Sequence, residues 1–252
     1  MADIHTVECR GWDEFKGTIV KELFQDAPFQ KSRFLFRGQV DPNWQLMSSY
    51  DRWFDEQGLD ESKRKEIAAQ LLGSFKQELR NAGHEQLVDE EGDPRIMAIA
   101  QHYGLPTRLL DWSESPYVAA FFAFVDVVLL KRDPQFVVVW ALDTKSYCWD
   151  GYGTRIVSVA SPRSNVRLRN QEGKFTILET LDKSIEDFVM KIKPTKSLDL
   201  PLRRFLIPGK DTVAALAELD AMGINPSRAY SDLQGFAMAA RVQQQLRVLA
   251  KL

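Results

Sequence analysis

The chain has 252 residues, with 33 basic and 35 acidic side chains and a formal net charge of -2. This balance excludes a protein that binds nucleic acid or a membrane surface through its bulk charge. A hydrophobic content of 44% and a charged content of 27% exclude global disorder and indicate a soluble globular protein. Neither an internal repeat nor a Gly/Ser/Pro-rich linker divides the chain, so we expect a single domain over residues 1–252.

The two cysteines, Cys9 and Cys148, provide no disulfide framework and no repeated CxxC or Cys/His spacing. This pattern fits a reducing compartment and argues against a zinc site, so we expect no metal. The N-terminal residues contain Asp3 and Glu8, where a secretory signal would have a basic segment followed by an apolar core. We therefore expect a cytoplasmic location.

Helical periodicity marks four segments in the first half of the chain. An apolar stripe predicts an N-terminal helix over residues 11–26 that packs on the domain. Residues 62–81 repeat apolar side chains at helical spacing and predict a surface helix. A third helix begins at Pro94 and ends at Gly104. A Ser-Pro pair at residues 115–116 suits an N-cap and a first helical position, and begins an apolar helix too short to span a membrane.

Strand patterns lie between and after these helices. Residues 33–37 alternate phenylalanine with other residues and stop at Gly38, which predicts a strand that ends with Arg37. Residues 136–142 form a β-branched and aromatic run that is compatible with a central strand. Shorter strand candidates are residues 155–159, 175–178 and 204–207.

The C-terminal part of the chain predicts two further helices. Asp211 is suited to cap a helix through Met222, and Ser231 a last helix through Val248. Helices then flank a mixed sheet without regular β-α alternation, so the predicted fold class is α+β. The glycine patterns of Rossmann and P-loop nucleotide sites are missing from the sequence, as are the G-x-S-x-G and H-E-x-x-H motifs of hydrolases.

Charge is distributed unevenly along the chain. Residues 41–95 hold 13 acidic and 7 basic side chains, a net charge of -6, whereas residues 155–210 hold 12 basic and 6 acidic side chains, a net charge of +6. Within the basic segment, Arg163, Arg167 and Arg169 would suit RNA, DNA or another anionic partner. The alternative is a solvated basic surface that binds nothing, which such clusters usually are.

Three segments concentrate polar residues more than folding alone demands. Residues 36–39 place a guanidinium at a strand end beside a glycine, which lets a ligand approach the backbone. Residues 101–113 gather many hydrogen-bonding side chains in one connector, and residues 169–175 form a polar turn before a strand. A structural ion pair remains the alternative for the arginine of the first segment, and Asp111 could simply pair with Arg108.

Four ordered motifs resemble the FRG family, which is named for its Phe-Arg-Gly motif. They are FRGQ at 36–39, QHYGLPTRLLDWSESPYVAAFFAF at 101–124, RNQEGKF at 169–175 and FLIPGKDTVAALAELDAMGINPSRAYSDLQGFA at 205–237. Together they cover about residues 30–245. The resemblance implies one FRG-type domain with the N-terminal helix packed on it.

The motif order is also similar to the Arg-Ser-Glu branch of the ADP-ribosyltransferase superfamily. In that branch an arginine on the first strand holds NAD, a Ser/Thr segment precedes a proline and an apolar helix, and a later strand supplies a carboxylate. Arg37 matches the first element, and residues 110–113 before 116–123 match the second. Gln171 stands at the third position, with Glu172 beside it. This resemblance implies a mixed, split β-sheet flanked by helices.

The second resemblance also implies site residues. Cleavage of the nicotinamide–ribose bond leaves a positive, oxocarbenium-like sugar, so a site must bind the pyrophosphate, orient the ribose and stabilise that charge. The implied catalytic residues are Gln171, Asp111 and Arg37. The implied NAD-binding residues are Arg37, Gly38, His102, Tyr103, Thr107, Arg108 and Ser113.

The implied function is an NAD-dependent ADP-ribosyltransferase that uses NAD as substrate, needs no metal, and modifies RNA, DNA or protein inside the cell. Family members with toxin or phage-defence associations imply a bacterial effector of that kind, and a toxin would have an antitoxin partner. Two alternatives stay open. One is a nucleic-acid-binding or processing protein without NAD chemistry, and the other is a non-catalytic regulatory module.

Overall fold

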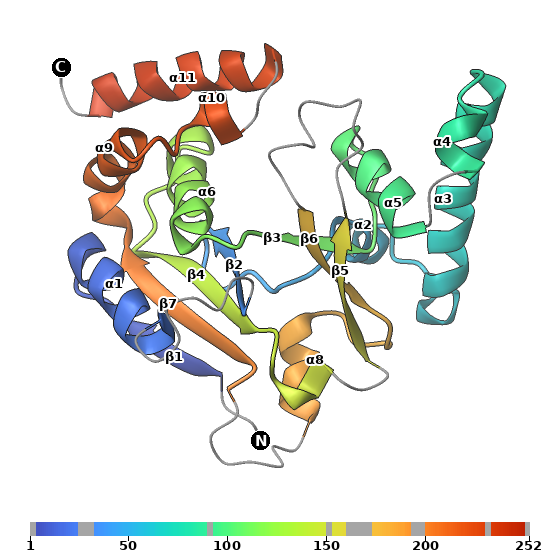
Figure 1. The fold of residues 1–252 in the computed structure, drawn as a ribbon, viewed down its shortest axis with the longest axis horizontal. Coiled ribbons are helices and arrows are strands. Elements are labelled where there is room, and N and C mark those ends of the chain that lie inside the picture. The colour runs from blue at the N-terminus through green and yellow to red at the C-terminus, as the bar shows by residue number, and fades with distance from the viewer. Residues whose placement is uncertain are drawn as a thin grey trace.

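A computed structural model describes residues 4–24, 33–89, 93–149, 153–159, 173–192, 200–229 and 233–249. Its strands are β1 (His5–Glu8), β2 (Phe34–Gln39), β3 (Leu109–Trp112), β4 (Phe136–Asp143), β5 (Thr154–Val159), β6 (Gly173–Leu178) and β7 (Leu202–Pro208). Its α-helices are α1 (Trp12–Ile19), α2 (Ser49–Glu56), α3 (Arg64–Asn81), α4 (Glu85–Asp89), α5 (Asp93–His102), α6 (Pro116–Leu129), α8 (Ile185–Lys191), α9 (Thr212–Ala221), α10 (Pro226–Ala229) and α11 (Leu233–Leu249). Helices and strands alternate irregularly along the chain, which confirms the α+β class (Figure 1).

The strands form two sheets. A four-stranded mixed sheet has the order β1-β7-β4-β2, in which β1 is parallel to β7 and the other neighbours are antiparallel. A three-stranded antiparallel sheet has the order β3-β6-β5. The two sheets meet where Phe36 of β2 and Ser113, just after β3, exchange backbone hydrogen bonds of 2.7 and 2.8 Å. This bridge brings the end of β2 beside β3.

Helix α6 packs against the four-stranded sheet and begins as its sequence predicts. The Ser115 hydroxyl accepts a 3.3 Å hydrogen bond from the backbone of Val118, and Pro116 is the first helical residue. Gly38 allows β2 to approach this helix closely, because a Cβ atom at position 38 would lie 1.8 Å from the carbonyl oxygen of Ala119. Glycine is therefore needed at position 38 because any larger side chain would push β2 and α6 apart.

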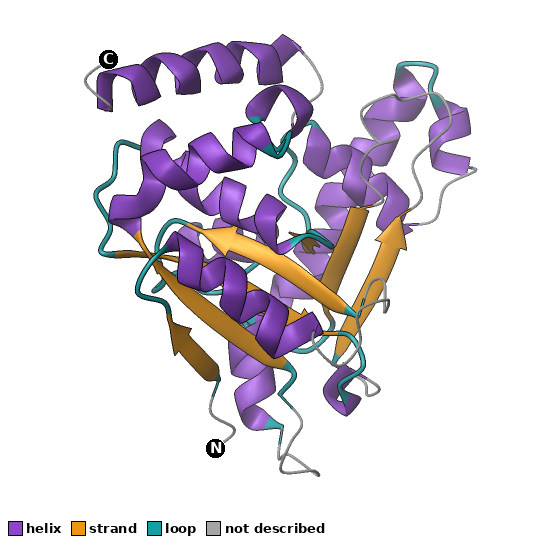
Figure 2. Cartoon of the chain, turned by 60° about the vertical axis from the view of Figure 1, so that its left-hand side comes forward, coloured by secondary structure: helices purple, strands orange, loops and turns teal. Residues whose placement is uncertain are grey.

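Side-chain alternation along β2 separates two hydrophobic cores. Phe34 and Phe36 join the core formed with α1, α6 and α9 on one face of the four-stranded sheet. Leu35 joins the core on the other face, with Trp140 and residues of β3 and α8. Because successive strand side chains point to opposite faces, Arg37 shares the face of Leu35. Figure 2 shows the helices that surround the sheets.

The N-terminal region differs from the sequence prediction. Residues 5–8 form β1, and the predicted helix over residues 11–26 is an α-helix only as far as Ile19, followed by a π-helical segment, Val20–Phe24. Residues 25 and 26 lie outside the described part of the chain. The short strand was missed because four residues carry too little alternation to be recognised.

Asp211 caps a different helix from the one we expected. Its Oδ2 atom accepts a 2.8 Å hydrogen bond from the backbone N–H of Trp12, the first residue of α1, and it makes no side-chain cap on α9. Helix α9 is otherwise where it was predicted, from Thr212 to Ala221. Ser231, the predicted cap of the last helix, lies outside the described residues, within which α11 begins at Leu233.

Three elements near the candidate motifs were not predicted. Residues 109–112 form β3, although they were expected to be part of a connector, and α2 and α8 carry no long periodic pattern. Ser48 is the N-cap of α2, and its hydroxyl accepts a 3.0 Å hydrogen bond from the backbone of Asp51. Within the described residues, no helix is both long and apolar enough to cross a bilayer. The single domain over residues 1–252 stays a prediction.

Candidate functional site

A cavity of about 280 Å³ lies where β2, α2 and the segment from α5 to β3 meet. Its polar lining residues are Arg37, Ser49, Arg52, Gln101 and Asp111. Gly104, Leu105, Pro106, Leu109 and Leu110 complete the lining. Residues from the first two polar segments of the sequence therefore converge on one cavity, together with two side chains of α2 that no motif marked.

An ion pair between β2 and β3 forms one wall of the cavity. Nη1 of Arg37 lies 3.0 Å from Oδ2 of Asp111 and donates a 2.8 Å hydrogen bond to the backbone oxygen of the same residue. The Arg37 side chain is 18% exposed and that of Asp111 is 60% exposed. Asp111 thus pairs with an arginine that is distant in sequence, and the alternative pairing with Arg108 is not the one formed.

The charge of Arg37 controls the ionisation of Asp111. The surrounding protein atoms oppose a charged carboxylate, but the positive charge and hydrogen bond of Arg37 outweigh that effect and lower the pKa of Asp111. The carboxylate is therefore ionised at neutral pH. A fixed negative charge on a cavity wall can stabilise a positive charge that develops in a bound molecule.

Gln101 and Thr107 hold the other side of Asp111. The Thr107 hydroxyl is buried and donates a 2.5 Å hydrogen bond to Oε1 of Gln101. This fixes the Gln101 amide so that its Nε2 atom lies 3.5 Å from Oδ1 of Asp111. Thr107 is thus placed behind the cavity wall, and Gln101 is the side chain that lines the cavity.

The first turn of α2 is fastened to the same loop. The backbone N–H of Thr107 donates a 3.1 Å hydrogen bond to the Ser49 hydroxyl, and the backbone N–H of Tyr50 donates a 3.1 Å bond to the carbonyl oxygen of Thr107. These contacts hold α2 beside the loop before β3. Arg52, one turn further along α2, lines the cavity as a result.

A buried arginine attaches α2 to α3. The Arg64 guanidinium contacts the carboxylates of Asp51, Asp55 and Glu61 at 2.8, 2.7 and 2.9 Å. Arg64 is 3% exposed, and its guanidinium also lies 4.5 Å from the ring centre of Phe54. The network makes α2 part of a rigid frame and places no charge of its own in the cavity.

Several predicted NAD-binding residues do not line this cavity. His102 and Tyr103 are exposed at the end of α5, with ring centres 5.2 Å apart. Arg108 donates a hydrogen bond to the carbonyl oxygen of Leu178 at the end of β6. The Ser113 hydroxyl accepts a 3.0 Å bond from the backbone of Ser115 before α6. Gly38, as described above, packs against α6.

Residues 169–172 of the predicted polar turn lie outside the described residues, and residues 173–175 already belong to β6. The residues outside the described part of the chain include Gln171 and Glu172 of the predicted chemistry, and Arg163, Arg167 and Arg169 of the predicted nucleic-acid surface. The structure does place β6 directly beside β3, with Phe175 opposite Asp111.

Sequence reasoning missed Ser49, Arg52 and the role of Gln101. A signal was present in Ser48-Ser49-Tyr50-Asp51, which matches the S/T-x-x-D/E pattern of a helix N-terminus and could have located α2. That pattern would still not have shown that α2 contacts β3 and lines the same cavity as Arg37, because contacts with β3, more than 50 residues further along the chain, leave no local signal.

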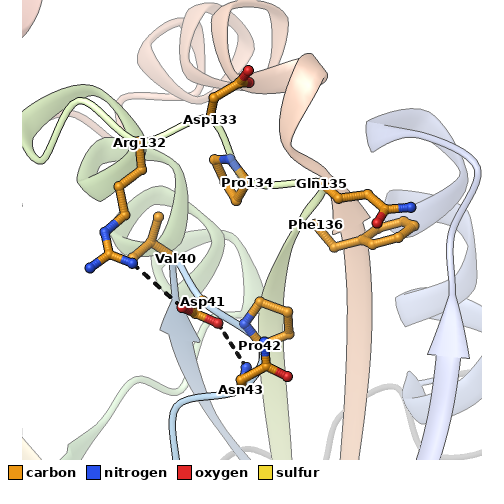
Figure 3. Close-up of a pocket in the computed structure, with 9 residues that line it drawn as sticks. All are labelled: Val40, Asp41, Pro42, Asn43, Arg132, Asp133, Pro134, Gln135 and Phe136. Atoms are coloured by element: carbon orange, nitrogen blue, oxygen red, sulfur yellow. Dashed lines mark hydrogen bonds and ion pairs between the residues drawn. The ribbon is translucent and has the colours of Figure 1, made fainter.

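A larger cavity of about 560 Å³ lies just beyond the C-terminal end of β2 (Figure 3). It is formed by residues 40–43 and the connection between α6 and β4, residues 132–136. Arg132 and Asp41 pair across it at 3.4 Å, and the Arg132 guanidinium lies 4.9 Å from the ring centre of Trp44. We assign function to the smaller cavity, because only that one brings together residues from two of the sequence motifs.

Neither cavity resembles a metal site. Within the described ranges, no group of three or more His, Cys, Asp or Glu side chains is arranged to hold a metal ion.

Comparison with known proteins identifies a family for this part of the chain. The family model of the FRG domain matches residues 32–128. No curated protein and no solved structure matches the chain. The matched range contains all ten residues that line the candidate cavity. Residues 32–128 are therefore similar to the FRG domain, and the candidate site lies within this matched range.

Proposed function

We propose that the cavity binds NAD and that the protein transfers ADP-ribose from NAD to a macromolecule inside the cell. The observation that carries this proposal is the Arg37–Asp111 pair, a cation and an ionised carboxylate side by side on a cavity wall between two sheets. The two sheets, bridged at Phe36 and Ser113, are similar to the split sheet that the ADP-ribosyltransferase resemblance implies.

Arg37 would bind the pyrophosphate of NAD. Its two described polar contacts, with the backbone oxygen and the carboxylate of Asp111, both use Nη1. A guanidinium has five N–H donors, so it can bind an oxyanion in addition to a carboxylate. A cavity of about 280 Å³ is at the lower end of the range for small-molecule sites. We therefore assign to it the nicotinamide, its ribose and the adjoining phosphates, and not the whole dinucleotide.

Asp111 would stabilise the reacting sugar. When the bond between ribose C1′ and the nicotinamide nitrogen breaks, its electron pair leaves with neutral nicotinamide and the ribose becomes positive. The ionised Asp111 carboxylate would offset that charge. A nucleophilic atom of the acceptor then forms a bond to C1′ and releases its proton to solvent. Gln101, held by Thr107, would keep the carboxylate oriented throughout.

The direct test combines NAD cleavage with transfer. Purified protein is incubated with adenine-labelled NAD and a bacterial cell extract, and nicotinamide release and macromolecular label are measured. Digestion of the product with nuclease or protease then identifies the acceptor class. We expect Asp111→Asn to lower the rate by about 100-fold or more, as losses of transition-state charge stabilisation do. Glu66→Gln, which makes the same chemical change at an exposed position of α3, should retain full activity.

Absence of both nicotinamide release and label transfer would reject the enzyme. Salt-sensitive RNA or DNA binding that NAD does not affect would then favour the nucleic-acid alternative. If the protein is a bacterial toxin or defence effector, as the family resemblance implies, its expression should arrest growth and Asp111→Asn should relieve the arrest.

A further inference from the structure

The candidate cavity contains a second guanidinium that no sequence motif marked. Arg52 of α2 lines the same cavity as Arg37, and among the lining residues only Asp111 is acidic. Two cations therefore face one carboxylate. Arg52 is exposed to solvent, and both the neighbouring protein atoms and the positive charge of Arg37 lower its pKa.

Arg37 itself has an unused hydrogen-bond donor. Its Nε atom is buried and has no hydrogen-bond partner among the described residues. Buried donors in folded proteins are nearly always paired, so an unpaired one inside a cavity wall requires an explanation. The atom is closed to solvent in this structure, so an oxyanion would satisfy the donor only after the Arg37 side chain shifts. Its negative charge would reduce the repulsion from Arg52 without such a shift.

The position of Arg52 is determined by the frame around it. Nη1 of Arg52 donates a 2.6 Å hydrogen bond to the carbonyl oxygen of Met47, just before α2. The helix is held on one side by the Ser49–Thr107 contacts and on the other by Arg64. Arg52 is thus presented by an anchored helix, as a residue that binds a ligand group of defined shape requires.

We propose that Arg52 is a second phosphate-binding residue, and that Arg37 and Arg52 together hold a diphosphate group. A diphosphate carries separate oxyanions on two phosphorus atoms, which suits two guanidinium groups from different elements better than a single phosphate does. The inference rests on the proposed function only for the statement that the complete ligand is NAD. The two arginines recognise the diphosphate group itself.

The test is calorimetric binding of inorganic diphosphate and of ADP-ribose, which contains the diphosphate but no nicotinamide. We expect Arg52→Ala to weaken both affinities by about tenfold or more, the loss typical of a hydrogen bond to a charged group. Arg52→Lys should weaken them less, since it keeps the charge and loses the planar fork. Arg10→Ala, at an exposed position whose guanidinium pairs with Glu14 on α1, should change neither affinity.

Thermal unfolding and circular dichroism establish that each variant is folded. If Arg52→Ala does not fold, Arg52→Gln takes its place. Failure of the wild type to bind diphosphate, or equal affinity in wild type and the Arg52 variants, would overturn the inference. Diphosphate binding that depends on Arg52, without any nicotinamide release, would reject the proposed transferase but support this site. Nicotinamide release by Arg52→Ala with an unchanged KM for NAD would support the proposed transferase and reject Arg52 as a phosphate-binding residue.

Discussion

At the scale of single residues, the ionisation of the Asp111 carboxyl group is needed for the proposed chemistry and also affects the stability of the fold, which can be measured. Its pKa is lowered in the folded protein because the Arg37 charge outweighs the opposing effect of the surrounding protein atoms. As pH falls, the unfolded chain therefore binds this proton first. The contribution of the ion pair to stability is present above the usual aspartate pKa of 3.8 and is lost as pH falls through the lower, folded pKa.

We expect this pH dependence of stability to appear when wild type is compared with Asp111→Asn. Wild type should be the more stable at about pH 7, and the difference in the free energy of unfolding should shrink at about pH 3. Urea unfolding followed by circular dichroism measures both values. A difference that is constant across this range would show that the pair does not form in solution.

Cys9 provides a second residue-scale prediction. Burial and the nearby Glu14 carboxylate raise the pKa of the Cys9 thiol to about 11. The thiolate is the reactive form, so Cys9 should resist alkylation by iodoacetamide at about pH 8 in the folded protein. In urea the same cysteine should react rapidly, and mass spectrometry distinguishes alkylated from unmodified Cys9. Rapid labelling of Cys9 under native conditions would contradict its burial.

At the scale of elements, the contact between β2 and α6 depends on Gly38. In Gly38→Ala the new Cβ atom would clash with the backbone of Ala119, and neither backbone can move without disturbing its element. We expect a loss of about 2 kcal/mol or more in the free energy of unfolding. Gly73→Ala is the control, because nothing lies within 4 Å of a Cβ atom at that helical position. That variant should gain roughly 0.5 to 1 kcal/mol.

Helix α2 depends on Arg64. Replacing Arg64 with methionine leaves the carboxylates of Asp51, Asp55 and Glu61 without their shared cation, and Asp51 is buried. Breaking a buried ion pair from one side costs about 3 to 5 kcal/mol. Urea unfolding should show this loss for Arg64→Met and almost none for Lys65→Met, the exposed neighbour on α3. Similar stabilities for the two variants would mean that the network does not hold α2.

At the scale of the whole molecule, the candidate site depends on how the two sheets meet. Arg37 belongs to the four-stranded sheet and Asp111 to the three-stranded sheet, and the bridge between Phe36 and Ser113 brings them together. A ligand that contacts both sheets should therefore stabilise the folded molecule as a unit. By mass action, ADP-ribose at 100 times its Kd should add about 2.7 kcal/mol to the free energy of unfolding.

This stabilisation is measured as a rise in Tm with ADP-ribose concentration. Arg37→Ala should abolish the rise, whereas Glu66→Gln should retain it. A concentration-independent Tm in the wild type would contradict ligand binding at this site.

Much of the local structure could be predicted from the sequence. The Ser-Pro start of α6, the β-branched run of β4 and the glycine that ends α5 are encoded in neighbouring residues, because capping, alternation and positive φ are short-range effects. The motifs of the FRG domain were recognisable for the same reason, and the family match confirms that resemblance. The NAD chemistry, the acceptor and the cytoplasmic location stay predictions.

The sequence by itself determined which polar residues were available, namely Arg37 beside a glycine and Asp111 in a polar segment. It placed Arg37 at the end of a strand and Asp111 in a connector, whereas β2 continues to Gln39 and Asp111 lies in β3. Only the tertiary structure decided that Arg37 and Asp111, separated by 74 positions, form one pair, that Arg52 joins them, and that Asp211 caps α1 across 199 positions. The physical reason is that such contacts arise from the packing of sheets and helices against shared cores. That packing leaves no periodic signal near either partner in the chain.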